Sequence, residues 1–144
     1  MAPPTRFWQT TPGRTFVGRV ATGSDLVEEI ERVCAEQGIM AAEVTVIGAV
    51  TRAVYAYRVH DEQRYEELVS DTHNELAGFV GNISDNGGKP FLHAHCTFAS
   101  ITGETVSGHL MKGTIAFVAE VIINEWTDVS LVRTHDEATG LNLW

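Results

Sequence analysis

The hexapeptide Phe91-Leu92-His93-Ala94-His95-Cys96 alternates imidazoles with small or apolar side chains. In a β-strand, successive side chains point to opposite faces, so His93 and His95 share one face and the apolar residues share the other. A turn at Thr102-Gly103 lets the following strand run back antiparallel and brings His109 alongside the pair. The sequence therefore predicts two antiparallel strands with three imidazoles on one face.

Three imidazole nitrogens with one open position form the ligand set of a catalytic-type zinc site. A single histidine on a strand is usually a surface residue or a satisfied core residue, and two could form a hydrogen-bonded pair. Three that converge are harder to explain in this way, because burying them without a partner costs desolvation free energy. We predict that His93, His95 and His109 bind a divalent metal, with zinc first because neutral imidazole suits it. Nickel, copper, iron and cobalt accept the same ligands.

Length and composition indicate one globular domain. The chain has 144 residues, of which 44% are hydrophobic. No apolar run approaches the roughly 20 residues of a membrane span, and the first residues lack the regions of a signal peptide, so we expect a cytoplasmic protein. The two cysteines, Cys34 and Cys96, make no disulfide framework and are predicted to be small buried apolar residues.

The net charge of −9 argues against a nucleic-acid-binding surface. Such a surface needs clustered lysines and arginines that displace counterions from phosphates. This chain has two lysines, and its eight arginines are scattered along the sequence. Autonomous DNA binding is therefore disfavoured unless a basic partner, or a patch built by oligomerisation, supplies the charge.

The order of predicted elements is that of one α+β unit. Residues 15–20 predict a first strand, and Ser24 or Asp25 predicts the cap of a helix that Gly38 ends. Strands are predicted over residues 43–48, 53–59, 65–69 and 75–84, before the two histidine strands.

Residues 114–126 form an almost unbroken apolar run, which predicts burial on both faces, either in the core or at a subunit interface. Glu120 lies inside this run and needs a partner. It could accept a hydrogen bond from a metal-bound histidine, act as a general acid or base beside the metal, or form a structural ion pair with an arginine. His73 could be a further ligand or a proton shuttle, although its polar neighbours favour a plain loop.

Several motifs together resemble the prokaryotic form of the PPC (plants and prokaryotes conserved) domain. The resemblance covers about Thr15 to Leu143 and leaves residues 1–14 as an N-terminal extension. It is carried by the following segments: Thr22-Gly23-Ser24-Asp25-Leu26, Gly81-Asn82-Ile83-Ser84, Lys89-Pro90-Phe91-Leu92-His93-Ala94-His95, Ser107-Gly108-His109-Leu110 and Ala119-Glu120-Val121-Ile122-Ile123.

The resemblance implies a single compact domain in which a curved, largely antiparallel mixed sheet packs beside one main helix. It also implies a homotrimer and a metal held by His93, His95 and His109. Plant relatives attach an AT-hook, a short basic element that grips the DNA minor groove, and this sequence has none. The family's customary DNA-binding label therefore rests on a segment that is missing from this sequence.

A looser similarity connects the three histidines with the zinc site of acetolactate decarboxylase, whose fold is related to the PPC domain. There the metal polarises a carbonyl and stabilises an enediolate. By this analogy the three histidines would hold the metal, a water or substrate oxygen would take the open position, and Glu120 would move protons. The arginine that such an enzyme uses to pair a substrate carboxylate has no clear match in this sequence.

Three classes of function follow, in order of preference. The first is a metal-binding homotrimeric module with an undefined ligand or regulatory role. The second is a small metal-dependent enzyme, a lyase or hydrolase, that acts on a carbonyl, carboxylate or ester substrate. The third is direct DNA binding, which the net charge disfavours. The sequence leaves open whether the protein is an enzyme, and an unknown small molecule is one possible partner.

Overall fold

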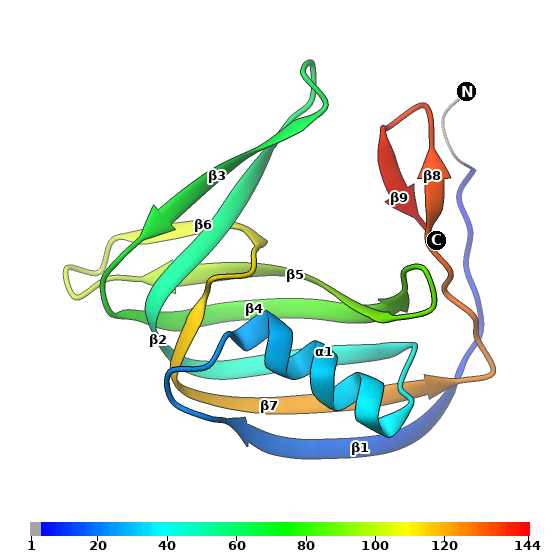
Figure 1. The fold of residues 1–144 in the computed structure, drawn as a ribbon, viewed down its shortest axis with the longest axis horizontal. Coiled ribbons are helices and arrows are strands. Elements are labelled where there is room, and N and C mark those ends of the chain that lie inside the picture. Colours follow the sequence, from blue (N-terminus) through cyan, green and yellow to red (C-terminus); the bar gives the residue numbers. More distant parts are fainter. Residues whose placement is uncertain (1–3) are drawn as a thin grey trace.

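One helix and nine strands follow one another along residues 4–144, which are the residues that the computed structural model describes (Figure 1). The elements are β1 (Thr11–Val20), α1 (Leu26–Gln37), β2 (Ala42–Val59), β3 (Arg64–Ser70), β4 (Asn74–Asp85), β5 (Pro90–Ala99), β6 (Thr105–Leu110), β7 (Ile115–Thr127), β8 (Thr134–Asp136) and β9 (Leu141–Leu143). The first strand thus begins four residues before the predicted position, at Thr11.

Helix α1 begins at a capping aspartate and ends at a glycine. Asp25 is the N-cap, and its carboxylate accepts hydrogen bonds from the backbone N–H groups of Val27 at 2.9 Å and Glu28 at 3.0 Å. Gly38 ends the helix with a φ of 68°, a left-handed conformation that glycine adopts at little cost. The predicted helix is confirmed, and Asp25 rather than Ser24 is its cap.

The strands form a seven-stranded antiparallel sheet in the order β1-β7-β2-β4-β5-β6, with β3 paired to β2. The first half of β2 pairs with β7 and β4, whereas its second half leaves this layer and pairs with β3 and β6. Strands β2, β4, β5 and β6 therefore close into a ring. The predicted single domain with a curved, mainly antiparallel sheet and one helix is confirmed.

Strand β2 corrects one detail of the sequence analysis, which predicted two separate strands over residues 43–48 and 53–59. The structure joins them, with register shifts around Gly48. Gly48 has a φ of 141°, and a Cβ atom there would lie 1.9 Å from the carbonyl oxygen of Val118. The chain therefore bends at a glycine without leaving the sheet, which is how one strand serves both layers.

The hydrophobic core lies between α1 and one face of the sheet. Leu26 and Ile30 from the helix are buried against sheet residues such as Val44, Ile83 and Phe98. Cys34 and Cys96 are free thiols within this core, as predicted, and burial raises the pKa of each to about 12. The opposite face of strands β5 and β6 points away from this core.

Strand β7 is buried on one face only within the chain. Ala119, Val121 and Ile123 are buried, while Ile122 is exposed. The prediction that this run is buried on both faces by the core is therefore wrong, and burial at a subunit interface stays a prediction. Within residues 4–144, no helix has the length and apolar character needed to cross a bilayer.

The segment that leads into the C-terminal hairpin of β8 and β9 is hydrogen-bonded to the end of strand β4 (Figure 1). The N–H of Asp85 donates to the carbonyl of Leu131 at 2.9 Å, and the N–H of Arg133 donates to the carbonyl of Asp85 at 2.7 Å. These bonds fix the backbone position of Arg133, whose side chain lies near the histidine strands.

Candidate metal centre

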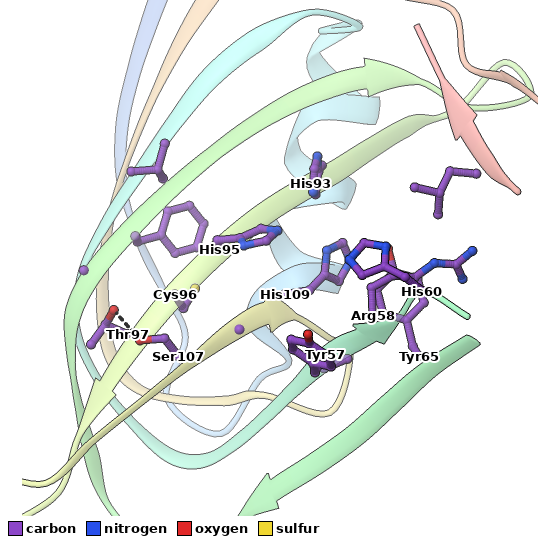
Figure 2. Close-up of a pocket in the computed structure, with 16 residues that line it drawn as sticks. Tyr57, Arg58, His60, Tyr65, His93, His95, Cys96, Thr97, Ser107 and His109 are labelled. Atoms are coloured by element: carbon purple, nitrogen blue, oxygen red, sulfur yellow. Dashed lines mark hydrogen bonds between the residues drawn. The ribbon is translucent and has the colours of Figure 1, made fainter. Parts of the chain in front are cut away.

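The three predicted histidines lie together on the face of the sheet that is opposite the core (Figure 2). His95 on β5 is the direct register partner of His109 on β6, and His93 lies two residues along β5 on the same face. The ring centroids are 5.0 to 5.5 Å apart, and one ligand atom from each ring lies within 4.8 Å of the others. The predicted convergence is therefore present in the structure.

Local sequence explains this placement. In β5 the side chains of Leu92, Ala94 and Cys96 are buried in the core, so the alternate residues His93 and His95 face the other way. In β6, Gly108 lets the strand approach β2 closely, since a Cβ atom at Gly108 would lie 2.8 Å from the carbonyl oxygen of Ala56. The close contact between β6 and β2 closes the ring that carries His109.

The environment of His93 and His109 favours their uncharged form. The pKa of His93 is lowered to about 4, mainly by burial and then by the neighbouring His109, Arg133 and His95 in that order. Burial also lowers the pKa of His109, with smaller contributions from His95 and Arg133. Neutral imidazole is the form that ligates a metal, so the lowered pKa values of His93 and His109 favour metal binding at neutral pH.

The donor set fits a zinc ion. Tetrahedral coordination at a Zn–N distance of about 2.0–2.1 Å places ligand nitrogens about 3.4 Å apart, and small side-chain rotations would bring these histidines to that spacing. The cluster holds three imidazoles and no carboxylate among the described residues, which leaves a fourth position open. The buried Oδ1 of Asn82, whose register partner is His93, lacks a hydrogen-bond donor within residues 4–144. The register places the Asn82 and His93 side chains on the same face of the sheet.

Two cavities meet at the cluster, and His93 and His109 line both. The larger has a volume of about 730 Å³ and is bordered by the β2–β3 hairpin, including Tyr57, Arg58 and His60 (Figure 2). The smaller, of about 370 Å³, is bordered by Arg58, Tyr65, Phe91, Arg133 and residues 140–143. The open side of the histidine cluster therefore faces space that could hold a small molecule.

Two arginines that the sequence analysis did not identify border these cavities. Arg133 is half-buried, donates from Nε to Ser84 Oγ at 2.7 Å and from Nη1 to the Asn142 carbonyl at 2.8 Å, and burial lowers its pKa. The Arg58 guanidinium lies 5.3 Å from the centre of the Tyr65 ring, which in turn lies 5.1 Å from His109. No local motif marks either arginine, because each reaches the cluster only through the tertiary fold.

Glu120 lies elsewhere in the sheet. Its register partners are Arg19 on β1 and Ile47 on β2, its side chain is exposed, and strands β2 and β4 separate β7 from β5. It lines neither cavity at the histidines. Within one chain the structure therefore does not bring Glu120 to the cluster, and its proton-transfer role stays an untested prediction. His73 also lies outside both cavities and packs edge-on against Phe117.

Comparisons with known proteins agree with this fold. The model of the Plants and Prokaryotes Conserved (PCC) domain matches residues 9–127. A metal-containing protein from Archaeoglobus fulgidus superposes with a TM-score of 0.92 at 34% identity, covering 97% of this chain and 99% of that chain. A plant- and prokaryote-conserved (PPC) protein from Pyrococcus horikoshii gives a TM-score of 0.92 at 29% identity, covering 97% and 96% of the two chains.

Among curated proteins, the bifunctional protein GlmU of Synechococcus sp. (strain JA-2-3B'a(2-13)) is 30% identical over 124 residues. The match covers 85% of this chain but only 18% of that much longer protein. The similarity therefore concerns one part of GlmU. From the extent of the family match and the shared fold, this chain belongs to the plants and prokaryotes conserved (PCC, also written PPC) domain family.

Proposed function

We propose that this protein is a metal-binding module in which His93, His95 and His109 hold one divalent ion, with zinc as the first candidate. The observation that carries the proposal is the convergence of three imidazoles, with ligand atoms within 4.8 Å of one another. The similarity to the metal-containing Archaeoglobus protein, at 34% identity over nearly the whole chain, supports it.

A bound zinc ion would supply Lewis acidity toward an oxygen atom of a ligand. The protein's own residues would hold that ligand. Arg58, His60 and Tyr65 border the larger cavity and offer hydrogen-bond donors, while Phe79 and Val80 contribute apolar surface. This arrangement favours a small-molecule role over a purely structural one, and a metal-dependent lyase or hydrolase is the second candidate function.

Elemental analysis of untagged protein, purified without added metal, tests the proposal. We expect about one ion per chain in the wild-type protein and less than about a tenth of that in a His93→Ala/His95→Ala variant, because one imidazole alone holds zinc weakly. A His73→Ala/His135→Ala variant is the matched control, since it also removes two histidines but leaves the cluster intact. Absence of metal from the wild-type protein, or equal metal in both variants, would overturn the site.

We also infer that the protein assembles as a homotrimer. The number of subunits rests on the family resemblance, and an exposed apolar surface supports association. We call this surface the β1–β7–β2 face and define it by Val17, Ile47 and Ile122, whose exposed fractions are 78%, 60% and 41%. These side chains are neighbours on adjacent strands, on the same side of the sheet as the histidines.

Direct DNA binding is not proposed. Besides the net charge of −9, many of the cations are already engaged by carboxylates. Arg14, Arg32, Arg52, Arg64 and Lys112 each lie within 4.0 Å of at least one acidic side chain. Contacts to phosphates would have to compete with these pairs, so nucleic acid would need a basic partner to bind here.

A further inference from the structure

Arg58 and Arg133 share the smaller cavity with His93 and His109, and neither arginine forms an ion pair within the described residues 4–144. They are also the only partly buried arginines among the described residues, since the other six are exposed. A half-buried guanidinium without a counter-ion carries a desolvation cost that an anion would offset.

The fold fixes the position of both guanidinium groups. Ser84 Oγ and the Asn142 carbonyl accept from Nε and Nη1 of Arg133, at 2.7 and 2.8 Å, which leaves Nη2 to donate elsewhere. The Thr139 carbonyl accepts from Nη2 of Arg58 at 3.1 Å, which leaves Nε and Nη1. The Cζ atom of Arg133 lies 5.0 Å from the centre of the Phe91 ring, so the ring packs against one face of the guanidinium. Both arginines are thus held in place and keep N–H groups that can donate to a ligand.

The C-terminal segment completes this cavity. Arg133 and residues 140–143 border it, and all of them lie beyond residue 127, where the family match ends. Leu141 lines both cavities at the histidines. The residues of the family match therefore supply the histidines, whereas the segment after residue 127 supplies an arginine and part of the wall.

The lining of the smaller cavity combines cationic and apolar groups without an acidic residue. With a divalent ion on the three histidines, the positive charge would increase further, so an anionic ligand is the complementary one. Phe91, Tyr65 and Leu141 offer apolar surface that an organic body would cover and that inorganic phosphate would leave unused. Arginine is also well suited to carboxylate recognition.

We propose that this cavity binds a small organic carboxylate, with Arg133 and Arg58 donating to the carboxylate and with Phe91, Tyr65 and Leu141 contacting its carbon body. The ligand would lie against His93 and His109, on the open side of the metal site. The inference deepens the proposed function and rests on it for the role of the metal, but the arginines can be tested separately.

The test is isothermal titration calorimetry of mandelate, a small aromatic 2-hydroxy carboxylate, into the wild-type protein, with metal content measured on the same sample. Mandelamide is the neutral ligand of matched shape, and inorganic phosphate is the oxyanion without an apolar body. We expect saturable mandelate binding and at least about tenfold weaker binding of mandelamide, because charge-assisted hydrogen bonds are stronger than neutral ones. Phosphate should bind more weakly than mandelate because it leaves the apolar surface of the cavity uncovered.

Arg133→Gln should weaken mandelate binding at least about tenfold while leaving the metal content unchanged. Arg52→Gln is the matched control, since it removes the same charge from an exposed arginine that borders neither cavity. Because Arg133 also holds the C-terminal hairpin, circular dichroism and melting temperature are compared for both variants. The ligand comparison on the wild-type protein does not depend on how either variant folds.

The outcomes separate the two proposals. Metal-loaded protein that binds mandelate and mandelamide equally, or binds neither, would overturn the carboxylate pocket and leave the metal site standing. Phosphate that binds as tightly as mandelate would overturn the assignment to an organic ligand. Metal-free wild-type protein that still binds mandelate through Arg133 would support the pocket and overturn the metal site.

Discussion

Gly108 sets the distance between β6 and β2, and therefore the position of His109. A Cβ atom at Gly108 would lie 2.8 Å from the backbone carbonyl oxygen of Ala56, which cannot rotate away as a side chain could. Gly108→Ala should therefore destabilise the protein by about 1–3 kcal/mol and lower its metal occupancy. Gly18→Ala is the control, because a Cβ atom at Gly18 meets nothing within 4 Å. Thermal melts and elemental analysis check both effects, and equal behaviour of the two variants would contradict this account of the ring.

At the scale of single residues, the histidines could be predicted and the arginines could not. His93 and His95 lie two apart on one strand, and His109 follows after one turn, so alternation and antiparallel pairing are enough to bring them together. Arg58 and Arg133 come from β2 and from the segment before β8, and only the ring closure and the C-terminal hairpin place them at the same cavity. Nothing in the local sequence around Arg58 or Arg133 indicates that the two side chains border one cavity.

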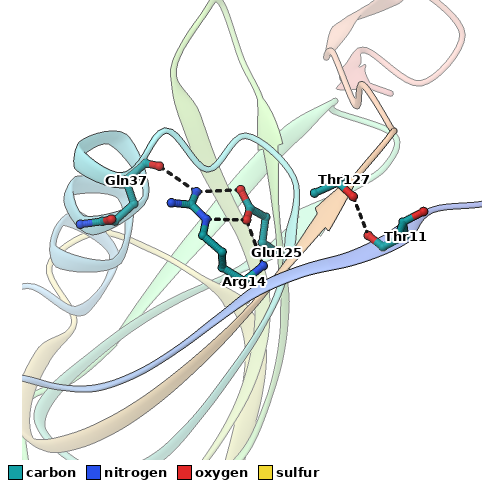
Figure 3. A network of polar contacts seen from close by, with 5 residues as sticks. All are labelled: Thr11, Arg14, Gln37, Glu125 and Thr127. Carbon is teal, nitrogen blue, oxygen red and sulfur yellow. Dashed lines mark hydrogen bonds and ion pairs between the residues drawn. The ribbon is translucent and has the colours of Figure 1, made fainter.

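The ends of β1, α1 and β7 are joined by one polar network, in which Arg14 pairs with Glu125 at 2.8 Å and also donates to the Gln37 carbonyl (Figure 3). Hydrogen bonds from Arg14 lower the pKa of Glu125 to about 2, from an ordinary value of 4.5. A carboxyl whose pKa is lower in the folded protein stabilises it above pH 4.5, and this contribution disappears as the pH falls toward 2.

Glu125→Gln should therefore lower the melting temperature by a few degrees at pH 7, and the difference from wild type should shrink steadily between pH 4.5 and pH 2. The effect is modest because Arg14 is half-exposed and solvent screens the pair. Glu137→Gln removes the same charge in the C-terminal hairpin and controls for net charge. A difference that persists unchanged at pH 2 would mean that packing, not the ion pair, is responsible.

The elements themselves were largely predictable, because the helix carries a capping residue and a terminal glycine and the strands alternate or end at turns. The joining of residues 43–48 and 53–59 into β2 was not, since the bend at Gly48 depends on the close approach of Val118 from β7. The exposure of one face of β7 was also missed. An apolar run does not reveal whether its second face is covered by the same chain or by another.

The metal should contribute to stability without being required for folding of the whole molecule. The buried core cluster excludes the three histidines, which lie on the opposite face of the sheet. Chelation should therefore lower the melting temperature by about 5–10 °C, as expected for loss of a ligand present at about 100 times its Kd, while the circular dichroism spectrum at 25 °C is retained. The His93→Ala/His95→Ala variant should not respond to chelator. Unfolding of the wild-type protein at 25 °C would instead assign the metal a structural role.

We expect assembly to depend on the β1–β7–β2 face, where Ile122 lies between Val17 on β1 and Thr45 on β2. If copies of the chain cover this face, a carboxylate at position 122 would be buried without a partner, at a cost of several kcal/mol. Light scattering should give a mass near three chains of 15.8 kDa for the wild-type protein and near one chain for Ile122→Asp. Ile101→Asp is the control, because Ile101 is fully exposed in the β5–β6 turn and lies away from this face. A monomeric wild-type protein would overturn the homotrimer, whereas a trimeric Ile122→Asp variant would place the interface on another surface and leave the apolar side chains of this face without an explanation.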